Sequence, residues 1–210
     1  MEKRRMRAEI RDSDMSEKND RPVIMTTQSP EETRQVGSIL AGLLLPNDVV
    51  ALDGDLGAGK TCLVGGVAAA LGVQSRVNSP TFTLVMEHDM NVPGQLVQNL
   101  YHFDAYRLDD AAAFAEIGLV EYFTAGGVCL IEWAERIASL LPSHAILVRL
   151  ERTDECSADC DKLRFVDGTL ILPADNKKRR LTVCGLADRR DEFVKRLRQQ
   201  NIGVQHDECY

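Results

Sequence analysis

The sequence predicts an α/β fold, a three-layer sandwich in which helices cover a mixed central sheet. Three observations carry this prediction. A short apolar run over residues 49–52 is followed by a glycine-rich loop and by apolar residues at helical spacing up to residue 71. Other short apolar runs alternate with helical patterns along the rest of the chain, which is typical of a sheet covered by helices. The link between the runs near residues 85 and 100 is short, so those two strands are expected to be antiparallel.

The first predicted helix begins after Ser29. Ser29 is a favoured N-cap residue, Pro30 suits the first helical position, and Glu32 completes a capping box. Apolar residues then recur at helical spacing over 36–43, and Pro46 is expected to close the segment.

A strand, the glycine-rich loop and a second helix follow. Residues 49–52 are all apolar, as in strands that are buried on both faces. The helix after the loop is expected to end at Gly72, where a C′ glycine belongs. The remaining elements are predicted in this order: a loop passing into a strand over 78–85, a hairpin turn within 88–98, a strand over 100–106, a helix over 109–116, a strand over 128–133, a helix over 134–141, a strand over 145–150, strands over 169–172 and 181–184, and a helix over 188–200.

The 210 residues suffice for one well-buried domain with tails. Residues 1–21 are densely charged and are expected to form a disordered extension. Residues 22–200 are predicted to be a single domain with a polar insert at about 151–176, and residues 201–210 a flexible tail. The extension lacks the apolar core of a signal peptide, and no apolar run approaches the ~20 residues of a membrane span, so a cytoplasmic protein without membrane contact is expected.

Charge and cysteine content narrow the classes of function. The formal charge of −7 argues against a protein that grips nucleic acid with its whole surface. The basic residues over 177–180 and 189–198 fit a solvated face, with a local contact to RNA or an acidic partner as the alternative. The six cysteines form no C-x-x-C pair, so a zinc site is not expected, and the thiols should be reduced.

The glycine loop, residues 54–61, matches the phosphate-binding pattern G-x-x-x-x-G-K-[ST]. Its glycines allow a tight turn in which successive N–H groups point at one anion. Lys60 supplies a mobile charge for the β- and γ-phosphates, and Thr61 supplies a hydroxyl for bound Mg²⁺. Strand, loop and helix in this order predict a P-loop NTPase fold, with a nucleotide bound at the start of the helix. The expected nucleotide-binding residues are Asp55, Leu56, Gly57, Ala58, Gly59, Lys60, Thr61 and Cys62.

A second metal ligand is expected from a carboxylate at a strand end. Glu132 follows four apolar residues, so its strand would deliver it to the carboxyl edge of the sheet beside the loop. Thr61 and Glu132 are therefore the predicted Mg²⁺ ligands, and Asp104 is the other candidate carboxylate. The guanine-reading pattern N-K-x-D fails at Arg179, which favours ATP over GTP.

Four motifs occur in one order along the chain and carry a resemblance to a known family. They are GDLGAGKT at 54–61, SPTFT at 79–83, HFDAYR at 102–107 and LIEWAER at 130–136. A chain with this series resembles the bacterial TsaE (YjeE) family over residues 25–150, and more faintly from Arg179 to the final helix. That family consists of small ATPases that take part in forming threonylcarbamoyladenosine at adenosine 37 of tRNA.

The resemblance implies a partner-stimulated ATPase that acts with TsaB-like and TsaD-like proteins. Its ATP hydrolysis would reset the TsaB–TsaD pair between turnovers, and contact with tRNA would be indirect. The resemblance also implies roles for Thr81 in a switch-like loop near the γ-phosphate, for Asp104 in hydrolysis or metal positioning, and for Trp133 beside the nucleotide. Residues 1–21 and 151–176 are additions to a short family member.

Two other functions remain open on the residues alone. A small-molecule kinase would use the same loop but needs an acceptor pocket and an arginine-rich lid, for which the 177–180 run is a poor candidate. A non-catalytic module would use nucleotide occupancy alone to reorder the 78–85 loop.

Overall fold

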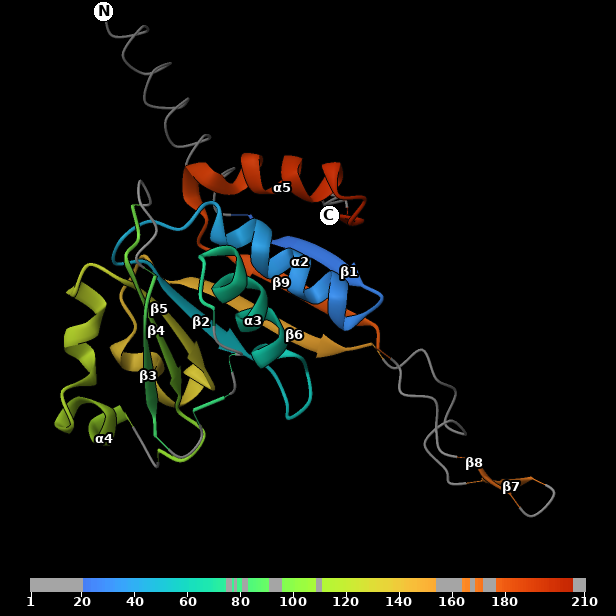
Figure 1. Cartoon of the computed structure of the whole chain (residues 1–210), viewed down its shortest axis with the longest axis horizontal. Coiled ribbons are helices and arrows are strands. Elements are labelled where there is room, and N and C mark those ends of the chain that lie inside the picture. Colours follow the sequence, from blue (N-terminus) through green and yellow to red (C-terminus); the bar gives the residue numbers. More distant parts are fainter. Residues whose placement is uncertain are drawn as a thin grey trace, which may run out of the picture.

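The computed structural model describes residues 21–74, 77, 79–80, 83–90, 96–108, 111–153, 164–166, 169–171 and 177–205. Its centre is a seven-stranded sheet in the order β1-β9-β6-β2-β5-β4-β3 (Figure 1). The strands are β1 (Val23–Thr27), β2 (Val49–Asp53), β3 (Val85–Asp89), β4 (Asn99–Asp104), β5 (Val128–Glu132), β6 (Ile146–Arg152) and β9 (Arg179–Cys184). β7 (Arg164–Val166) and β8 (Thr169–Ile171) pair only with each other among the described residues.

The sheet is mixed, as the sequence predicts. β2 lies between β5 and β6 and is parallel to both, and β4 is parallel to β5. β3 is antiparallel to β4, and β9 is antiparallel to both β1 and β6. The parallel strands β4, β5 and β2 therefore end at one edge, where their last residues meet.

Helices cover both faces of the sheet. α2 (Pro30–Ala41) and α3 (Lys60–Ala70) lie on one face, and α5 (Arg190–Gln199) packs beside α2 (Figure 1). The other face carries α4 (Ala111–Glu116) and the 3₁₀ segments η1 (Leu119–Thr124) and η2 (Ala134–Leu140), while η3 (Ala187–Arg189) leads into α5. This arrangement confirms the predicted three-layer α/β fold.

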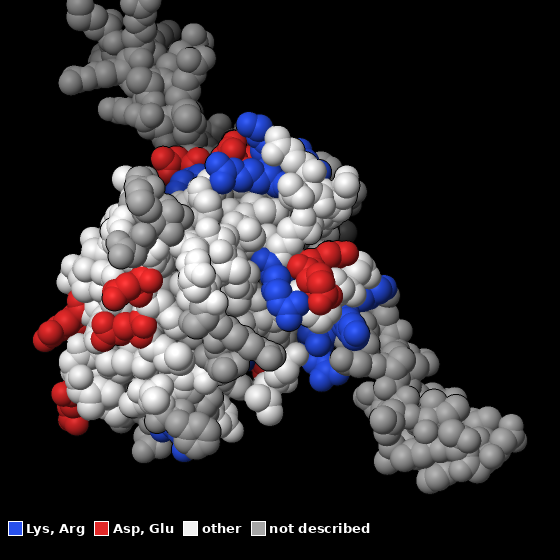
Figure 2. Space-filling model, viewed as in Figure 1, with Lys and Arg blue, Asp and Glu red and all other residues white. Residues whose placement is uncertain are grey.

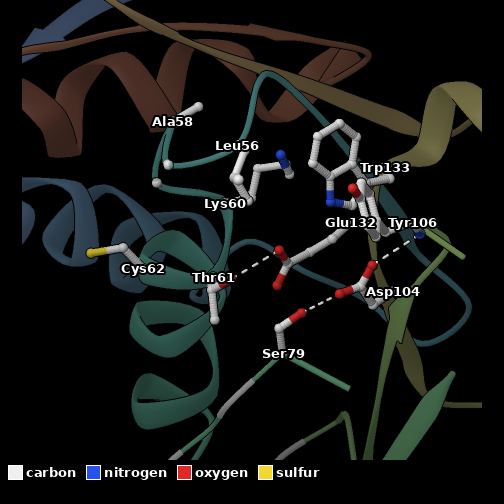
Figure 3. Close-up of a pocket in the computed structure, with 12 residues that line it drawn as sticks. Leu56, Ala58, Lys60, Thr61, Cys62, Ser79, Asp104, Tyr106, Glu132 and Trp133 are labelled. Atoms are coloured by element: carbon white, nitrogen blue, oxygen red, sulfur yellow. Dashed lines mark hydrogen bonds between the residues drawn. The ribbon is translucent and has the colours of Figure 1, made fainter. Parts of the chain in front are cut away.

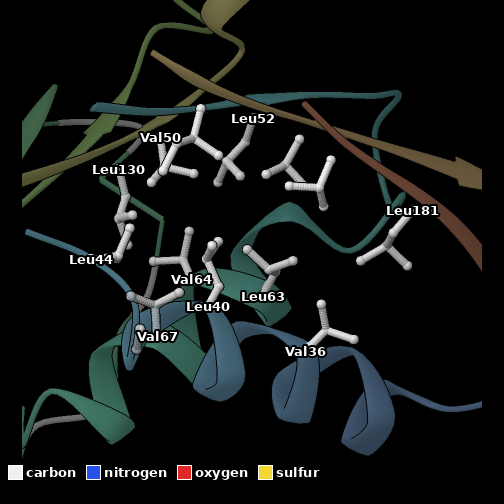
Figure 4. Packing of buried hydrophobic residues seen from close by; sticks show 14 of the residues in the cluster. Val36, Leu40, Leu44, Val50, Leu52, Leu63, Val64, Val67, Leu130 and Leu181 are labelled. Atoms are coloured by element: carbon white, nitrogen blue, oxygen red, sulfur yellow. The ribbon is translucent and has the colours of Figure 1, made fainter. Parts of the chain in front are cut away.

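The residues of β2 show how the two layers of core form. Val50 and Leu52 point into the cluster beneath α2 and α3, which Figure 4 shows with Leu40 and Val64. The alternate residues of β2 belong to the second cluster, on the opposite face, with Phe114 among its members. A strand with apolar side chains on both faces reads as a continuous apolar run, which is why this strand is visible in the sequence.

The start of α2 agrees with the capping prediction. The Ser29 hydroxyl accepts a hydrogen bond from the Glu32 N–H at 3.1 Å, and Pro30 occupies the first turn. The Glu32 carboxylate reaches back to the N–H of Gln28 at 2.8 Å. α2 ends at Ala41, earlier than Pro46. At the end of α3, Gly72 has a φ of 90° and ends the helix as predicted.

Several boundaries differ from the sequence prediction. β1 was not predicted, because its five residues stand alone before the first helix. β3 begins only at Val85, and the 134–140 segment is 3₁₀ rather than α, since Trp133 and Ile137 have non-helical backbone angles. β3 and β4 are antiparallel, as their short link predicts. The Met90 N–H donates to the Gln98 carbonyl between the two strands at 2.9 Å. The first two residues of the helix predicted over 109–116, Asp109 and Asp110, lie outside the described residues.

The loose tail expected from residue 201 does not begin there. Ile202 is buried, Val204 forms a β-bridge with Met25, and the Gln205 N–H donates to the Ile24 carbonyl at 2.8 Å. These residues close the outer edge of β1, so the prediction is wrong for 202–205.

Many of the C-terminal basic residues are engaged within the protein. Arg189 forms an ion pair with Asp48, which is itself 6% exposed. Arg196 and Lys195 both pair with Glu192 on α5. Figure 2 shows basic side chains along the top of the molecule, where α5 lies. Arg189, Lys195 and Arg196 therefore have acidic partners within the protein. In the part of the chain that the structure describes, no helix has the length and apolar character needed to span a membrane.

Candidate nucleotide-binding site

The glycine loop joins the end of β2 to the start of α3. Gly54, Gly57 and Gly59 have φ values of 139°, 77° and 109°, a region that disfavours other residues. A Cβ atom at Gly54 would lie 2.2 Å from the Leu150 carbonyl oxygen of β6. The loop therefore needs glycine both for its turn and for its packing against the sheet. Gly59 is the N-cap of α3, so the N-terminus of an 11-residue helix opens at the loop.

A cavity of about 420 Å³ lies at this end of α3 (Figure 3). It is lined by Leu56, Gly57, Ala58, Gly59, Lys60, Thr61, Cys62, Ser79, Asp104, Tyr106, Glu132 and Trp133. The structure thus brings together nearly all the residues that the sequence places in a site. Asp55 is exposed and outside the lining, although its carbonyl accepts a hydrogen bond from Lys60. Thr81 lies outside the described residues.

Lys60 is buried at the centre of the site. Its ammonium donates to the carbonyls of Gly54 and Asp55, the latter at 3.1 Å, and lies 3.7 Å from the centre of the Trp133 ring. Burial lowers the pKa of Lys60, and the nearby Glu132 carboxylate opposes that shift. A buried cation held by carbonyl dipoles and an aromatic face is well placed to bind an anion that enters the cavity.

Glu132 ends β5 and joins three elements. Its Oε2 accepts a hydrogen bond from the Thr61 hydroxyl of α3 at 2.9 Å. Its Oε1 lies 3.0 Å from Nε2 of His102 on β4. Because Glu132 and His102 are both buried, this geometry fixes the carboxylate firmly. His102 is not among the predicted site residues, although the alternation along β4 places it on the same face as Leu100 and Asp104.

Asp104 lies directly opposite Glu132 in the pairing of β4 with β5. Its Oδ1 accepts from the Tyr106 N–H at 3.0 Å, and its Oδ2 accepts from the Ser79 hydroxyl. The Asp104 N–H also donates to the Leu84 carbonyl at 3.0 Å. Asp104 therefore ties both ends of the 79–84 segment to the sheet edge.

Trp133 forms one wall of the cavity. It has a left-handed backbone with a φ of 59°, which turns the chain out of β5 at the end of the sheet. Its ring centre lies 5.0 Å from that of Tyr106, and it is half-buried (Figure 3). Cys62 lines the opposite wall, and burial raises the pKa of its thiol.

The donor atoms of this site fit Mg²⁺. The Thr61 hydroxyl and the Glu132 carboxylate are hard oxygen ligands that lie 2.9 Å apart. Among the described residues, no group of three or more His, Cys, Asp or Glu side chains could hold a metal by itself. Mg²⁺ in proteins is commonly held by one or two protein oxygens together with phosphate oxygens and water, and the oxygens of Thr61 and Glu132 fit that role.

Comparisons with known proteins identify the family. The model of the threonylcarbamoyl adenosine biosynthesis protein TsaE matches residues 27–160. A Bacillus subtilis protein named tRNA threonylcarbamoyladenosine biosynthesis protein TsaE is 42% identical over 129 residues, 61% of this chain and 77% of that protein. A Treponema pallidum protein of the same name is 43% identical over 124 residues, 59% of this chain and 87% of that protein.

A solved structure agrees with the sequence comparisons. The crystal structure of YdiB from Bacillus subtilis matches 87% of this chain and 97% of its own, with 30% identity and a TM-score of 0.59. The match of the family model extends over well more than half of the 210 residues and contains the glycine loop, Asp104 and Glu132. The chain therefore belongs to the TsaE family of threonylcarbamoyl adenosine biosynthesis proteins.

Proposed function

We propose that this protein binds and hydrolyses Mg·ATP to drive the formation of threonylcarbamoyladenosine in tRNA. The observation that carries the proposal is the contact of Thr61 with Glu132 at 2.9 Å, next to the buried Lys60 in one cavity. Family membership supports the tRNA modification, and the phosphate-loop pattern supports the nucleotide.

The residues divide the work of binding and hydrolysis. The loop N–H groups and Lys60 hold the phosphates, and the open N-terminus of α3 adds a favourable dipole. Thr61 and Glu132 would hold Mg²⁺, which when bound neutralises developing charge on the phosphate oxygens. Trp133 and Tyr106 form a wall that shields Lys60 from water.

Asp104 acts on the segment that precedes β3. Its hydrogen bond from Ser79 holds the chain two residues before Thr81, which the family resemblance places near the γ-phosphate. We assign to Asp104 the positioning of Thr81 during hydrolysis. This role differs from that of Glu132, because the Asp104 oxygens bond to Ser79 and Tyr106, whereas Glu132 bonds to the Thr61 hydroxyl.

The same geometry supports dependence on a partner. Of the described residues that line the cavity, Lys60 is the one with a cationic side chain. Arg136, the last residue of the LIEWAER motif, donates to the Leu108 carbonyl at 3.0 Å. Slow hydrolysis by the isolated protein is therefore expected, with stimulation by a TsaB-like and TsaD-like pair. The protein would contact tRNA only indirectly, through that pair. Such a function belongs to the cytoplasm.

The test is a reconstitution with purified TsaB-like and TsaD-like proteins, tRNA and Mg·ATP. Hydrolysis should be faster in the full mixture than with this protein alone, and repeated cycles of tRNA modification should require ATP hydrolysis. Lys60→Ala is the control, because it removes the phosphate-binding cation. Failure of the wild-type protein either to bind Mg·ATP or to bind the partner pair would refute the proposal. Many modification cycles with a non-hydrolysable analogue would instead favour a nucleotide-gated binding module.

A further inference from the structure

Arg179 contacts the glycine loop but is not among the residues that line the cavity. It is the first residue of β9 and lies more than a hundred residues after the loop in sequence. Its Nε donates to the Ala58 carbonyl at 3.1 Å, and its Nη2 donates to the Gly57 carbonyl at 3.3 Å. One guanidinium thus spans two consecutive carbonyls of the loop.

An anion-binding loop leaves carbonyls of this kind in need of hydrogen-bond donors. When successive N–H groups converge on one anion, the carbonyls between them point outward and need donors of their own. The carbonyl of Ala58 belongs to the peptide unit whose N–H is that of Gly59. The carbonyl of Gly57 belongs to the unit of the Ala58 N–H, which donates to the Asp55 carbonyl at 3.1 Å and closes the turn of the loop. Holding each carbonyl outward therefore also sets the direction of the N–H in the same planar peptide unit.

The sheet holds Arg179 in place for this contact. Its backbone pairs with Thr27 of β1 and with Arg152 of β6. Its Nη1 also donates to the Lys178 carbonyl at 2.9 Å, which restrains the guanidinium plane. The planar fork of arginine donates to two acceptors in fixed directions, whereas a lysine ammonium acts as a point charge.

We propose that Arg179 is a positioning residue that holds the Gly57 and Ala58 carbonyls and so directs the Gly59 N–H toward the anion. The inference rests on the proposed nucleotide binding and adds a residue outside the phosphate-loop motif to that site. It accounts for a basic residue that the sequence analysis assigned to a solvated face.

The test uses the single tryptophan as a reporter. Trp133 lies 3.7 Å from the Lys60 ammonium, so its fluorescence should report nucleotide entry without any added label. Affinities for Mg·ATP, Mg·ADP and inorganic pyrophosphate are measured for the wild type, Arg179→Met and Arg179→Lys. Arg180→Met is the matched control, because Arg180 is the next residue, is exposed and contacts Gln205 rather than the loop.

Arg179→Met should weaken all three ligands by roughly tenfold or more, since hydrogen bonds from charged donors are among the stronger ones. Arg179→Lys should bind with an affinity between those of Arg179→Met and the wild type, and Arg180→Met should bind as tightly as the wild type. Wild-type affinity in Arg179→Met would overturn the inference. Full recovery by Arg179→Lys would also overturn it, because the effect would then come from charge alone.

Two controls separate this inference from its alternatives. Melting temperatures and near-ultraviolet circular dichroism of the variants check that the fold is retained. If Arg179→Met does not fold, Arg179→Gln, which keeps one donor, takes its place under the same criteria. Absence of any nucleotide binding by the wild type would refute the proposed function itself, whereas unchanged binding in the variants refutes only the role of Arg179.

Discussion

Glu132 is the residue on which most of the site depends. Each of its two oxygens has a different partner, the Thr61 hydroxyl on one side and the His102 ring on the other. A buried carboxylate costs free energy unless it is hydrogen-bonded, so both partners stabilise it in this position. The carboxylate is thereby held beside the Thr61 hydroxyl, where the proposed function has the two side chains share Mg²⁺.

Replacing Glu132 with alanine should separate binding from hydrolysis. Lys60 and the loop N–H groups remain, so Mg·ATP should still bind, while Mg²⁺-dependent hydrolysis should fall by about a hundredfold through loss of electrostatic stabilisation. Single-turnover hydrolysis in the partner complex, together with Trp133 fluorescence for binding, measures the two effects. Normal turnover by Glu132→Ala would remove Glu132 from the proposed metal site.

His102 should matter through Glu132 rather than by contact with the nucleotide. His102→Leu leaves Oε1 of Glu132 buried without its donor, and loss of such an outer partner typically costs about 10–100-fold in metal affinity. We expect a higher Mg²⁺ concentration for half-maximal hydrolysis, with little change in metal-free nucleotide binding. His102→Gln keeps a donor and should lie closer to the wild type. An unchanged Mg²⁺ requirement in His102→Leu would argue against this role.

The site residues that the sequence predicts lie in short contiguous patterns, whereas those that it does not predict depend on partners far along the chain. Lys60 and Thr61 belong to one contiguous motif, and Glu132 ends an apolar run, so each is visible without the fold. His102 and Arg179 act on partners 30 and 121 residues away. His102 stands in the HFDAYR motif and Arg179 begins the fainter C-terminal resemblance, but neither position by itself indicates its partner. The topology of the sheet brings them together, and one sequence does not reveal that topology.

At the scale of elements, two glycines let α2 and α3 pack with their backbones in contact. A Cβ atom at Gly66 of α3 would lie 2.0 Å from the Arg34 carbonyl oxygen of α2. One at Gly37 of α2 would lie 2.3 Å from the Leu63 carbonyl oxygen of α3. Because α3 begins at the glycine loop, this contact also sets the direction in which the open N-terminus of α3 points.

Gly66→Ala should therefore destabilise the fold by about 1–3 kcal/mol, the usual cost of overpacking. Gly65→Ala is a matched control in the same helix, since a Cβ atom there meets nothing within 4 Å. Alanine at Gly65 should raise the free energy of unfolding by up to about 1 kcal/mol through helix propensity. Urea denaturation of the three proteins measures both shifts. Equal stabilities for the two variants would contradict the close packing of α2 on α3.

Predictions for elements succeeded where a pattern was long or bounded. α2 has a cap at its start, and β2 and β5 are apolar runs that parallel neighbours bury. β1 was not predicted because it lies at the edge of the sheet and pairs with β9, which lies far along the chain. The η2 segment fits helical spacing, but the left-handed Trp133 directs it to a tighter 3₁₀ path.

At the scale of the whole molecule, the site is assembled from widely separated parts of the chain. The loop between β2 and α3 and the ends of β4 and β5 meet around one cavity, and Arg179 at the start of β9 contacts that loop. Apolar clusters on both faces of the sheet hold these elements in place. A ligand in the cavity therefore contacts several elements that come apart when the protein unfolds.

Binding of Mg·ATP should for this reason stabilise the predicted domain of residues 22–200 as one unit. A ligand at a hundred times its Kd contributes about 2.7 kcal/mol. For a domain of this size, such a gain raises Tm by about 5–10 °C. Calorimetry of the wild type with and without Mg·ATP should give one main transition that moves as a whole, and Lys60→Ala should show no shift. Two transitions of which only one responds to the nucleotide would show that the chain folds as more than one unit, with the site confined to part of it.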